Sequence, residues 1–148
     1  MTSHWQKQLE RLAAGRPALL TGIRRGVEKE SLRISPEGTL AQTPHPPGLG
    51  SALTHGSITT DYSEALLEFI TPVSTSIEGT LETLADIHSF VYRELGNERL
   101  WALSMPCIVS GDAGIPVARY GSSNVARMKT VYRLGLGHRY GRMMQAIA

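Results

Sequence analysis

The stretch RGVEKESLRI, residues 25–34, decides how this chain of 148 residues folds. Its alternating polar and apolar residues are typical of a β-strand, and the strand carries two glutamates, Glu28 and Glu30. Residues two apart on a strand share a face, so both carboxylates point the same way. If that face lines the protein interior, the two carboxylates need a cation or another partner to hold them there.

Helical and extended patterns surround this strand. Trp5, Leu9 and Leu12 recur at helical spacing and predict an amphipathic helix that ends before the Gly-Arg-Pro at 15–17. The patterns that follow predict a strand over 22–34, a turn over 35–40 that leads into a short returning strand, a Pro- and Gly-rich loop over 42–51, and a segment over 57–72 that is β-rich at both ends and helix-prone in its middle.

A second helix is indicated by the capping-box spacing of Thr75 and Glu78, and Gly96 suits its C-terminal end. We expect its apolar face to consist of Leu81, Leu84, Ile87 or His88, Val91 and Leu95. The remaining patterns predict a buried strand over 101–109, a turn over 111–116, a last helix capped by Ser122, Ser123 or Asn124 that runs to about Gly135, and an extended apolar segment over 139–148.

These elements mix strands and helices without a regular strand–helix–strand repeat. The pattern therefore favours an α+β fold around a largely antiparallel sheet. The length suits one domain or part of a larger one. Because residues 143–148 read as the opening of a strand with no turn after it, we expect the chain to be a fragment whose fold is incomplete.

The composition excludes several classes of protein. An apolar content of 41% and a charged content of 19% are typical of a soluble globular chain. No apolar run approaches the roughly 20 residues of a membrane-spanning helix, and the first ten residues have no apolar core of a secretory signal. Cys107 is the one cysteine, which excludes an internal disulfide, fits a reducing cytoplasm and predicts an inert thiol in the core.

The charge is unevenly distributed along the chain. No acidic residue follows Asp112, whereas six basic ones do, so the part before that point has a net charge of −4 although the whole chain carries +2. A basic tail suggests nucleic acid. Here Val125, Met128, Val131 and Tyr132 interleave with the basic residues at helical spacing, which favours a packed helix with a solvated face. An acidic partner further along a longer chain explains the imbalance equally well.

A second acidic stretch, DYSEALLEF at 61–69, has two readings. A strand places Glu64 and Glu68 on one face, and a helix adds Asp61 to them. We prefer the strand because of the FITPV that follows. Carboxylates that share a cavity repel one another, and oxygen-preferring divalent cations such as Mg²⁺ relieve that repulsion. The plainer alternative is a solvated acidic face paired with Arg24, Arg25 or Lys29.

Longer strings add a family resemblance. GIRRGVEKESLRI, GSALTH, ITTDYSEALLEFITPV, LSMPC and YGSSNVARMKTVYRLGLGHRYGRMMQAI together resemble the N-terminal part of bacterial glutamate–cysteine ligase, also called γ-glutamylcysteine synthetase. The resemblance implies a glutamine-synthetase-like fold with a curved, largely antiparallel sheet, flanking helices, and a cytoplasmic enzyme of glutathione biosynthesis. It implies that ATP phosphorylates the γ-carboxylate of L-glutamate and that the amine of L-cysteine then attacks the acyl phosphate.

The resemblance also assigns roles to individual residues. It implies a Mg²⁺ site, with Mn²⁺ as the alternative ion, whose ligands are Glu28, Glu30, Asp61 and Glu68. It places four residues at the substrates: Tyr132 by the cysteine pocket, and Leu136, Gln145 and Ile147 around glutamate. Each of these four also fits a plain role in packing or hydrogen bonding, as do His55 and Cys107.

Family members run to several hundred residues, so residues 1–148 are expected to be the N-terminal portion of a single catalytic domain. The groups expected further along include a histidine metal ligand and most of the adenine pocket, and without them we expect the isolated chain to lack ligase activity. Two alternatives stay open: a related carboxylate–amine ligase with another amine acceptor, and a truncated, non-catalytic binding protein. Nucleic-acid and membrane partners are not expected.

Overall fold

A computed structural model describes residues 3–15 and 21–143. Its core is a four-stranded sheet with the strand order β2-β3-β1-β4, in which every neighbouring pair is antiparallel. The predicted α+β class with a largely antiparallel sheet is therefore confirmed. The strands are β1 (Glu28–Ile34), β2 (Ile58–Thr60), β3 (Leu66–Ile70) and β4 (Arg99–Leu100), and the α-helices are α1 (His4–Gly15), α2 (Ile77–Glu94) and α3 (Asn124–Tyr140).

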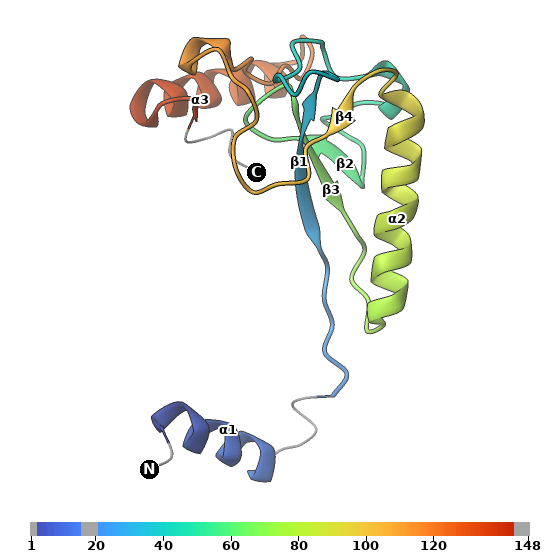
Figure 1. Cartoon of the computed structure of the whole chain (residues 1–148), viewed down its shortest axis with the longest axis vertical. Coiled ribbons are helices and arrows are strands. Elements are labelled where there is room, and N and C mark those ends of the chain that lie inside the picture. The colour runs from blue at the N-terminus through green and yellow to red at the C-terminus, as the bar shows by residue number, and fades with distance from the viewer. Residues whose placement is uncertain (1–2, 16–20, 144–148) are drawn as a thin grey trace.

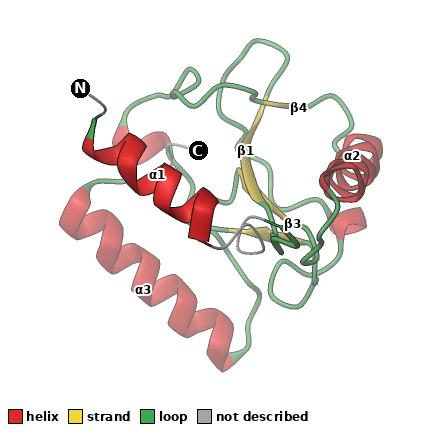
Figure 2. Cartoon of the chain, turned by 90° about the horizontal axis from the view of Figure 1, so that it is seen from below, coloured by secondary structure: helices red, strands yellow, loops and turns green. Residues whose placement is uncertain are grey.

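Helices α2 and α3 lie on opposite sides of the sheet (Figures 1 and 2). On the α2 side, Leu67 and Phe69 of β3 pack with Ile87 and Val91 of the helix in one buried cluster. On the other side, Leu32 and Leu66 join a second cluster that the segments between β4 and α3 cover. Alternation along β1 and β3 therefore serves both faces, since each strand buries alternate residues against a different layer.

The opening stretch is a strand, although a shorter one than predicted. The β1 ladder begins at Glu28, and the residues before it contribute one isolated antiparallel bridge between Arg25 and Ser74. The predicted turn after β1 is confirmed by the hydrogen bond from Ser35 N to Thr39 O, 2.8 Å. The returning strand is reduced to isolated bridges, one of which joins Ile34 and Leu40. The 42–51 loop contains one 3₁₀ turn, Pro47–Leu49.

Helix α2 confirms the predicted second helix with two corrections. Its N-cap is Ser76, whose hydroxyl accepts from Gly79 N at 3.0 Å, one residue later than the predicted Thr75. Gly96 adopts the left-handed φ of +60° that a helix end requires, as expected. Leu81 was placed on the buried face but is 59% exposed, because the helix turns Thr80, Ile87 and Val91 towards the sheet instead.

The predicted buried strand over 101–109 is wrong. The ladder ends at Leu100, and Leu103 and Met105 are more than half exposed. The segment instead forms a loop that the Trp101 indole closes by donating to Met105 O at 2.7 Å. Cys107 is buried as expected, and burial raises the pKa of its thiol, which fits an inert core residue. The turn predicted over 111–116 contains the 3₁₀ turn Asp112–Gly114.

The last helix is capped as predicted and extends further than predicted. The Ser123 hydroxyl accepts from Ala126 N at 3.1 Å, and the helix continues past Gly135 to Tyr140, where Gly141 ends it. The extended conformation predicted from residue 139 is therefore wrong for Arg139 and Tyr140, and residues 144–148 lie outside the described part. A glycine inside a helix costs only about 1 kcal/mol, which packing against the second cluster outweighs here.

The apolar residues of the last helix do not face the core. Val125, Met128, Val131 and Tyr132 are 55–72% exposed, whereas the inward face contains Ala126, Lys129, Thr130 and Arg133. The prediction of a packed apolar face is thus wrong for these residues. Helix α1 shows the same feature: its helical prediction is confirmed, but Trp5, Leu9 and Leu12 are each more than half exposed, and α1 lies apart from the sheet (Figure 1).

Candidate functional site

Two of the predicted metal ligands, Glu30 and Glu68, lie directly opposite each other on the neighbouring strands β1 and β3. The β1–β3 register pairs Glu30 with Glu68, and the β2–β3 register adds Thr59 on the same row. Like charges directly opposite one another destabilise an antiparallel pair. Because Glu68 lies within β3, the preferred interpretation of this stretch as a strand is confirmed for Glu68.

Glu28 lies on the same face as Glu30, two residues along β1, and both line a concavity of about 440 Å³. The opposite wall of this concavity is the loop after β4, from Trp101 to Ser104. The two glutamates are exposed, whereas Glu68 is half-buried. The acidic end of the sheet thus borders an open hollow.

Asp61 follows β2 directly and belongs neither to a helix nor to a strand. Its carboxylate oxygen Oδ1 lies 3.2 Å from Arg133 Nη2, and Arg133 Nε donates to its carbonyl oxygen at 2.6 Å. Sequence patterns did not single out Arg133, since the pair joins residues 72 positions apart. This arginine of the basic tail thus has an acidic partner that lies earlier in the sequence.

The negative charges of Glu28 and Asp61 act on the two paired glutamates, Glu30 and Glu68. Glu30 is only partly covered, yet this partial burial raises the pKa of its carboxyl, and the negative charges of Asp61 and Glu28 add to the rise. Burial likewise raises the pKa of Glu68, with further contributions from Asp61, Glu28 and Glu30, and Arg133 acts in the opposite direction. Glu28, Glu30, Asp61 and Glu68 are from here on called the acidic face.

Carboxylate oxygens are hard donors of the kind that Mg²⁺ and Mn²⁺ bind, so the chemistry of the acidic face fits such an ion. Within residues 3–15 and 21–143, no three acidic, histidine or cysteine side chains are gathered closely enough to form a metal cage. Nor, in the same residues, does Glu28, Glu30 or Glu68 form an ion pair with Arg24, Arg25 or Lys29, as the solvated alternative would have it. The ligand assignments stay predictions.

Glu64 has a different environment from the one that the strand reading assigned. It lies in the turn before β3 and is 6% exposed, and its two carboxylate oxygens accept from His45 N at 2.9 Å and Arg119 N at 2.6 Å. The prediction that Glu64 aligns with Glu68 on a strand face is wrong. Because backbone amides occupy both of its oxygens, Glu64 holds two loops together.

The four predicted substrate residues lie at the end of the chain. Leu136 packs against the second core cluster, whereas Tyr132 is 65% exposed and lines an apolar concavity along α3. The plain packing role therefore fits Leu136 and does not fit Tyr132. Gln145 and Ile147 lie outside the described residues. His55 is a hydrogen-bonding loop residue, since its Nδ1 accepts from Ser57 N and Ile58 N.

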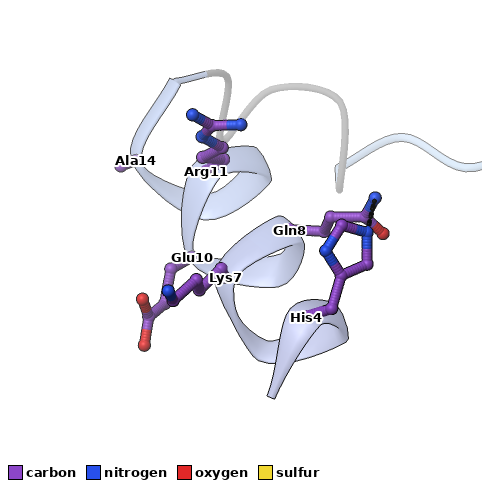
Figure 3. A pocket seen from close by; sticks show the side chains of 6 residues that line it. All are labelled: His4, Lys7, Gln8, Glu10, Arg11 and Ala14. Carbon is purple, nitrogen blue, oxygen red and sulfur yellow. Dashed lines mark hydrogen bonds between the residues drawn. The ribbon is translucent and has the colours of Figure 1, made fainter. Parts of the chain in front are cut away.

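A further concavity, of about 500 Å³, runs along α1 (Figure 3). Its walls are His4, Lys7, Gln8, Glu10, Arg11 and Ala14. Every one of these residues belongs to the same exposed helix, and the contact within the group is the 3.1 Å hydrogen bond between His4 and Gln8. A hollow with a single helix for its walls does not enclose a ligand, so we assign it no function.

Known proteins are similar to this chain in sequence and in fold. The glutamate–cysteine ligase family model matches residues 9–148. Glutamate–cysteine ligase of Alcanivorax borkumensis is 66% identical over 93% of the chain and 26% of its own length, and that of Sodalis glossinidius is 61% identical over 89% and 25%. The chain thus spans about a quarter of the length of these curated relatives.

Solved structures agree. Glutamate–cysteine ligase of Francisella tularensis in complex with AMP superposes with a TM-score of 0.80, at 45% identity over 84% of this chain and 25% of its own. A bifunctional glutathione synthetase from Pasteurella multocida gives 0.74, at 34% identity over 92% of this chain and 18% of its own. An acidic sheet face and these neighbours define an α+β ligase fold, present here in part.

Within that class, the chain belongs to the glutamate–cysteine ligase family. Among the described residues, no helix is long and apolar enough to cross a membrane.

Proposed function

We propose that this chain supplies the acidic part of an ATP- and Mg²⁺-dependent ligase that joins L-glutamate to L-cysteine. Residues 1–148 would form the N-terminal portion of a single catalytic domain, in the cytoplasm, at the first step of glutathione biosynthesis. Membership of the glutamate–cysteine ligase family supports this substrate pair, and the AMP in the related Francisella structure supports the use of ATP.

The proposed reaction has two steps. An oxygen of the glutamate γ-carboxylate attacks the γ-phosphorus of ATP, ADP leaves, and an acyl phosphate forms. The amine of cysteine then attacks the acyl carbon, its proton is lost to a base, and inorganic phosphate leaves as the amide forms. Both carboxylate and triphosphate are anionic, so the first step needs positive charge between them.

The acidic face is the observation that carries the proposal. Glu30 lies directly opposite Glu68 on the neighbouring strand, and Glu30 borders an open concavity. Two like charges at this spacing destabilise the sheet unless a cation binds there. Glu28, Glu30, Asp61 and Glu68 would hold Mg²⁺, with Mn²⁺ as the alternative. A divalent ion at this place supplies the charge that stabilises phosphoryl transfer.

The substrates would lie along α3 and beyond it. Tyr132 would border the cysteine, and Leu136, Gln145 and Ile147 would surround the glutamate. The exposure of Tyr132 supports this role, because an aromatic residue that is 65% exposed is available to a ligand or to further protein. Neither nucleic acid nor a membrane is among the proposed partners.

The proposal is tested by replacing single ligands in the natural polypeptide that contains residues 1–148. Glu28→Gln or Glu68→Gln should lower ATP-dependent formation of γ-glutamylcysteine at saturating Mg²⁺ by at least about 10²-fold, as the loss of transition-state charge stabilisation usually does. Glu82→Gln, on the exposed side of α2, is the matched control and should leave the rate unchanged.

Two results would overturn parts of the proposal separately. Near-normal turnover of both glutamine variants would remove the ligand assignment. If the wild-type protein consumed ATP with another amine and not with cysteine, the assignment of cysteine as the substrate would be wrong.

A further inference from the structure

Arg133 reaches from α3 to the segment that follows β2 and contacts Asp61 twice. Its Nε donates to the Asp61 carbonyl oxygen at 2.6 Å, and its Nη2 lies 3.2 Å from Oδ1 of the same residue. The arginine side chain is 11% exposed and the aspartate side chain 50%. One planar group thus fixes the backbone and the carboxylate of a single residue, which a flexible ammonium group cannot do as well.

Tyr120 fixes the same place from a second direction. Its hydroxyl lies 2.7 Å from Thr60 O and 2.9 Å from Asp61 O, and the residue is 8% exposed. The Arg133 guanidinium lies over its ring, 4.8 Å from the centroid, and Lys129 Nζ lies 4.7 Å from it. Stacking on the ring limits the movement of the guanidinium and therefore of Asp61.

The contacts leave half of the Asp61 carboxylate available. Among the described residues, Oδ1 has Arg133 as its partner and Oδ2 has none. Because the Asp61 side chain is 50% exposed, solvent screens this ion pair, and its contribution to stability is on the order of 1 kcal/mol. Orientation of the carboxylate is therefore a larger consequence of the pair than stabilisation of the fold.

We propose that Arg133 is a positioning residue of the cation site, acting through Asp61 and not through the substrates. The inference rests on the proposed function, in which Asp61 is a ligand of the divalent ion. By holding the backbone and Oδ1, Arg133 fixes where Oδ2 stands and so sets the affinity of the acidic face for the ion. Partners of metal ligands typically change metal affinity 10- to 100-fold when they are removed.

The experiment measures Mn²⁺ binding to the natural polypeptide in the absence of substrates, from the electron paramagnetic resonance signal of the free ion. Arg133→Gln should weaken Mn²⁺ binding about 10-fold. Arg133→Lys should weaken it nearly as much, because lysine keeps the charge but cannot make both contacts. Arg139→Gln is the control: this arginine lies on the same helix, over the Tyr140 ring, and its loss should change nothing.

Asp61→Asn separates this inference from the proposed function. If Asp61→Asn leaves Mn²⁺ affinity unchanged, the ligand assignment of Asp61 fails. If Asp61→Asn weakens binding and Arg133→Gln does not, the positioning role alone fails. If Arg133 acts through Asp61, then adding Arg133→Gln to Asp61→Asn causes no further loss, whereas an independent loss in the double variant would overturn the inference.

Folding of the variants is followed by thermal melting. Should Arg133→Gln fail to fold, Arg133→Lys and Tyr120→Phe decide the matter in its place. Tyr120→Phe removes only the hydroxyl that holds Thr60 and Asp61, so it should weaken Mn²⁺ binding by a smaller factor. Unchanged binding in both of these variants would overturn the inference.

Discussion

At the scale of the residue, the buried polar groups explain more of the fold than the sequence pattern suggests. Arg33 is fully buried near the end of β1, and its guanidinium donates to Glu98, to Thr43 and to the carbonyl oxygen of Glu64. A single arginine thus joins the strand to the loop before β2, the turn before β3 and the segment before β4. Arg33 and Glu98 form an ion pair, and removing the arginine leaves the largely buried carboxylate of Glu98 without its opposite charge.

We therefore expect Arg33→Leu to lower the free energy of unfolding by about 3 kcal/mol. Chemical denaturation of the natural polypeptide measures this change. Arg99→Leu is the matched control, because Arg99 is exposed and, within the described residues, its side chain donates to the carbonyl oxygens of its neighbours Asn97 and Glu98 alone. A loss at Arg33 no larger than the loss at Arg99 would contradict the role of the buried network.

His45 introduces a dependence on pH. Burial and then the positive charge of Arg33 lower the pKa of its imidazole below the ordinary value of 6.5, while Glu64 opposes them. The folded state therefore binds fewer protons than the unfolded state as the pH falls. The stability that His45 contributes is present above about pH 6.5 and is lost as the pH falls below it.

The expected result is that the melting temperature of the wild-type protein falls more steeply between pH 7 and pH 5 than that of His45→Gln. Both proteins contain the same carboxylates, so the difference between the two curves reports on His45 alone. Parallel curves would show that its titration is not coupled to folding.

At the scale of the element, helix α3 shows what periodicity can and cannot predict. Its cap at Ser123 follows from the local sequence, because a serine before a helical run accepts from the first turn. Its end does not, because Gly135 and Gly137 suggest a stop that packing overrides. Its apolar residues face outward, because Arg133 and Lys129 face Tyr120 on the inward side.

The two glycines of α3 give opposite predictions. A Cβ at Gly137 would lie 2.0 Å from the hydroxyl oxygen of Tyr62, whereas a Cβ at Gly135 meets nothing within 4 Å. Gly135→Ala should raise the free energy of unfolding by about 0.5–1 kcal/mol through helix propensity. Gly137→Ala should lower it by about 1–3 kcal/mol, because α3 or Tyr62 must move.

Chemical denaturation of the two variants tests this contrast. Tyr62→Phe removes the atom in conflict, so it should recover part of the loss caused by Gly137→Ala. Equal effects of the two alanine substitutions would mean that α3 does not pack against Tyr62 as described.

The sheet, like helix α3, was predictable from the sequence only in part. Alternation predicts that β1 places Glu28 and Glu30 on one face, because that follows from strand geometry alone. The pairing of Glu30 with Glu68 depends on register, which no local pattern specifies. The contacts of Glu64 with His45 and Arg119, and of Arg133 with Asp61, join distant segments, so only the folded chain reveals them.

At the scale of the whole molecule, the chain exposes more surface than its mass requires. Its accessible surface is 9646 Å², whereas a compact monomer of 16.1 kDa has about 7400 Å². Apolar residues of α1 and α3 account for part of the excess. Exposed apolar residues in this number favour association.

We accordingly expect the isolated polypeptide of 148 residues to self-associate as its concentration rises, which sedimentation velocity measures. Met128→Lys combined with Val131→Lys should reduce the association, since these residues are among the most exposed apolar side chains of α3. Val73→Lys combined with Leu81→Lys is a control with the same charge change at two exposed apolar residues outside α3. Equal reduction by the control would place the contact elsewhere.

The register of β1 with β3 also bears on how the chain folds. Glu30 and Glu68 are nearly forty positions apart in sequence, and the same ladder pairs Leu32 with Leu66 one row from Ser31 and Leu67. Zipping that starts from the Leu32–Leu66 row brings Glu30 and Glu68 together in the third of five rows, against their mutual repulsion. A divalent ion would then act on the middle of the ladder, so its concentration should govern how long a partly paired, aggregation-prone sheet persists after synthesis.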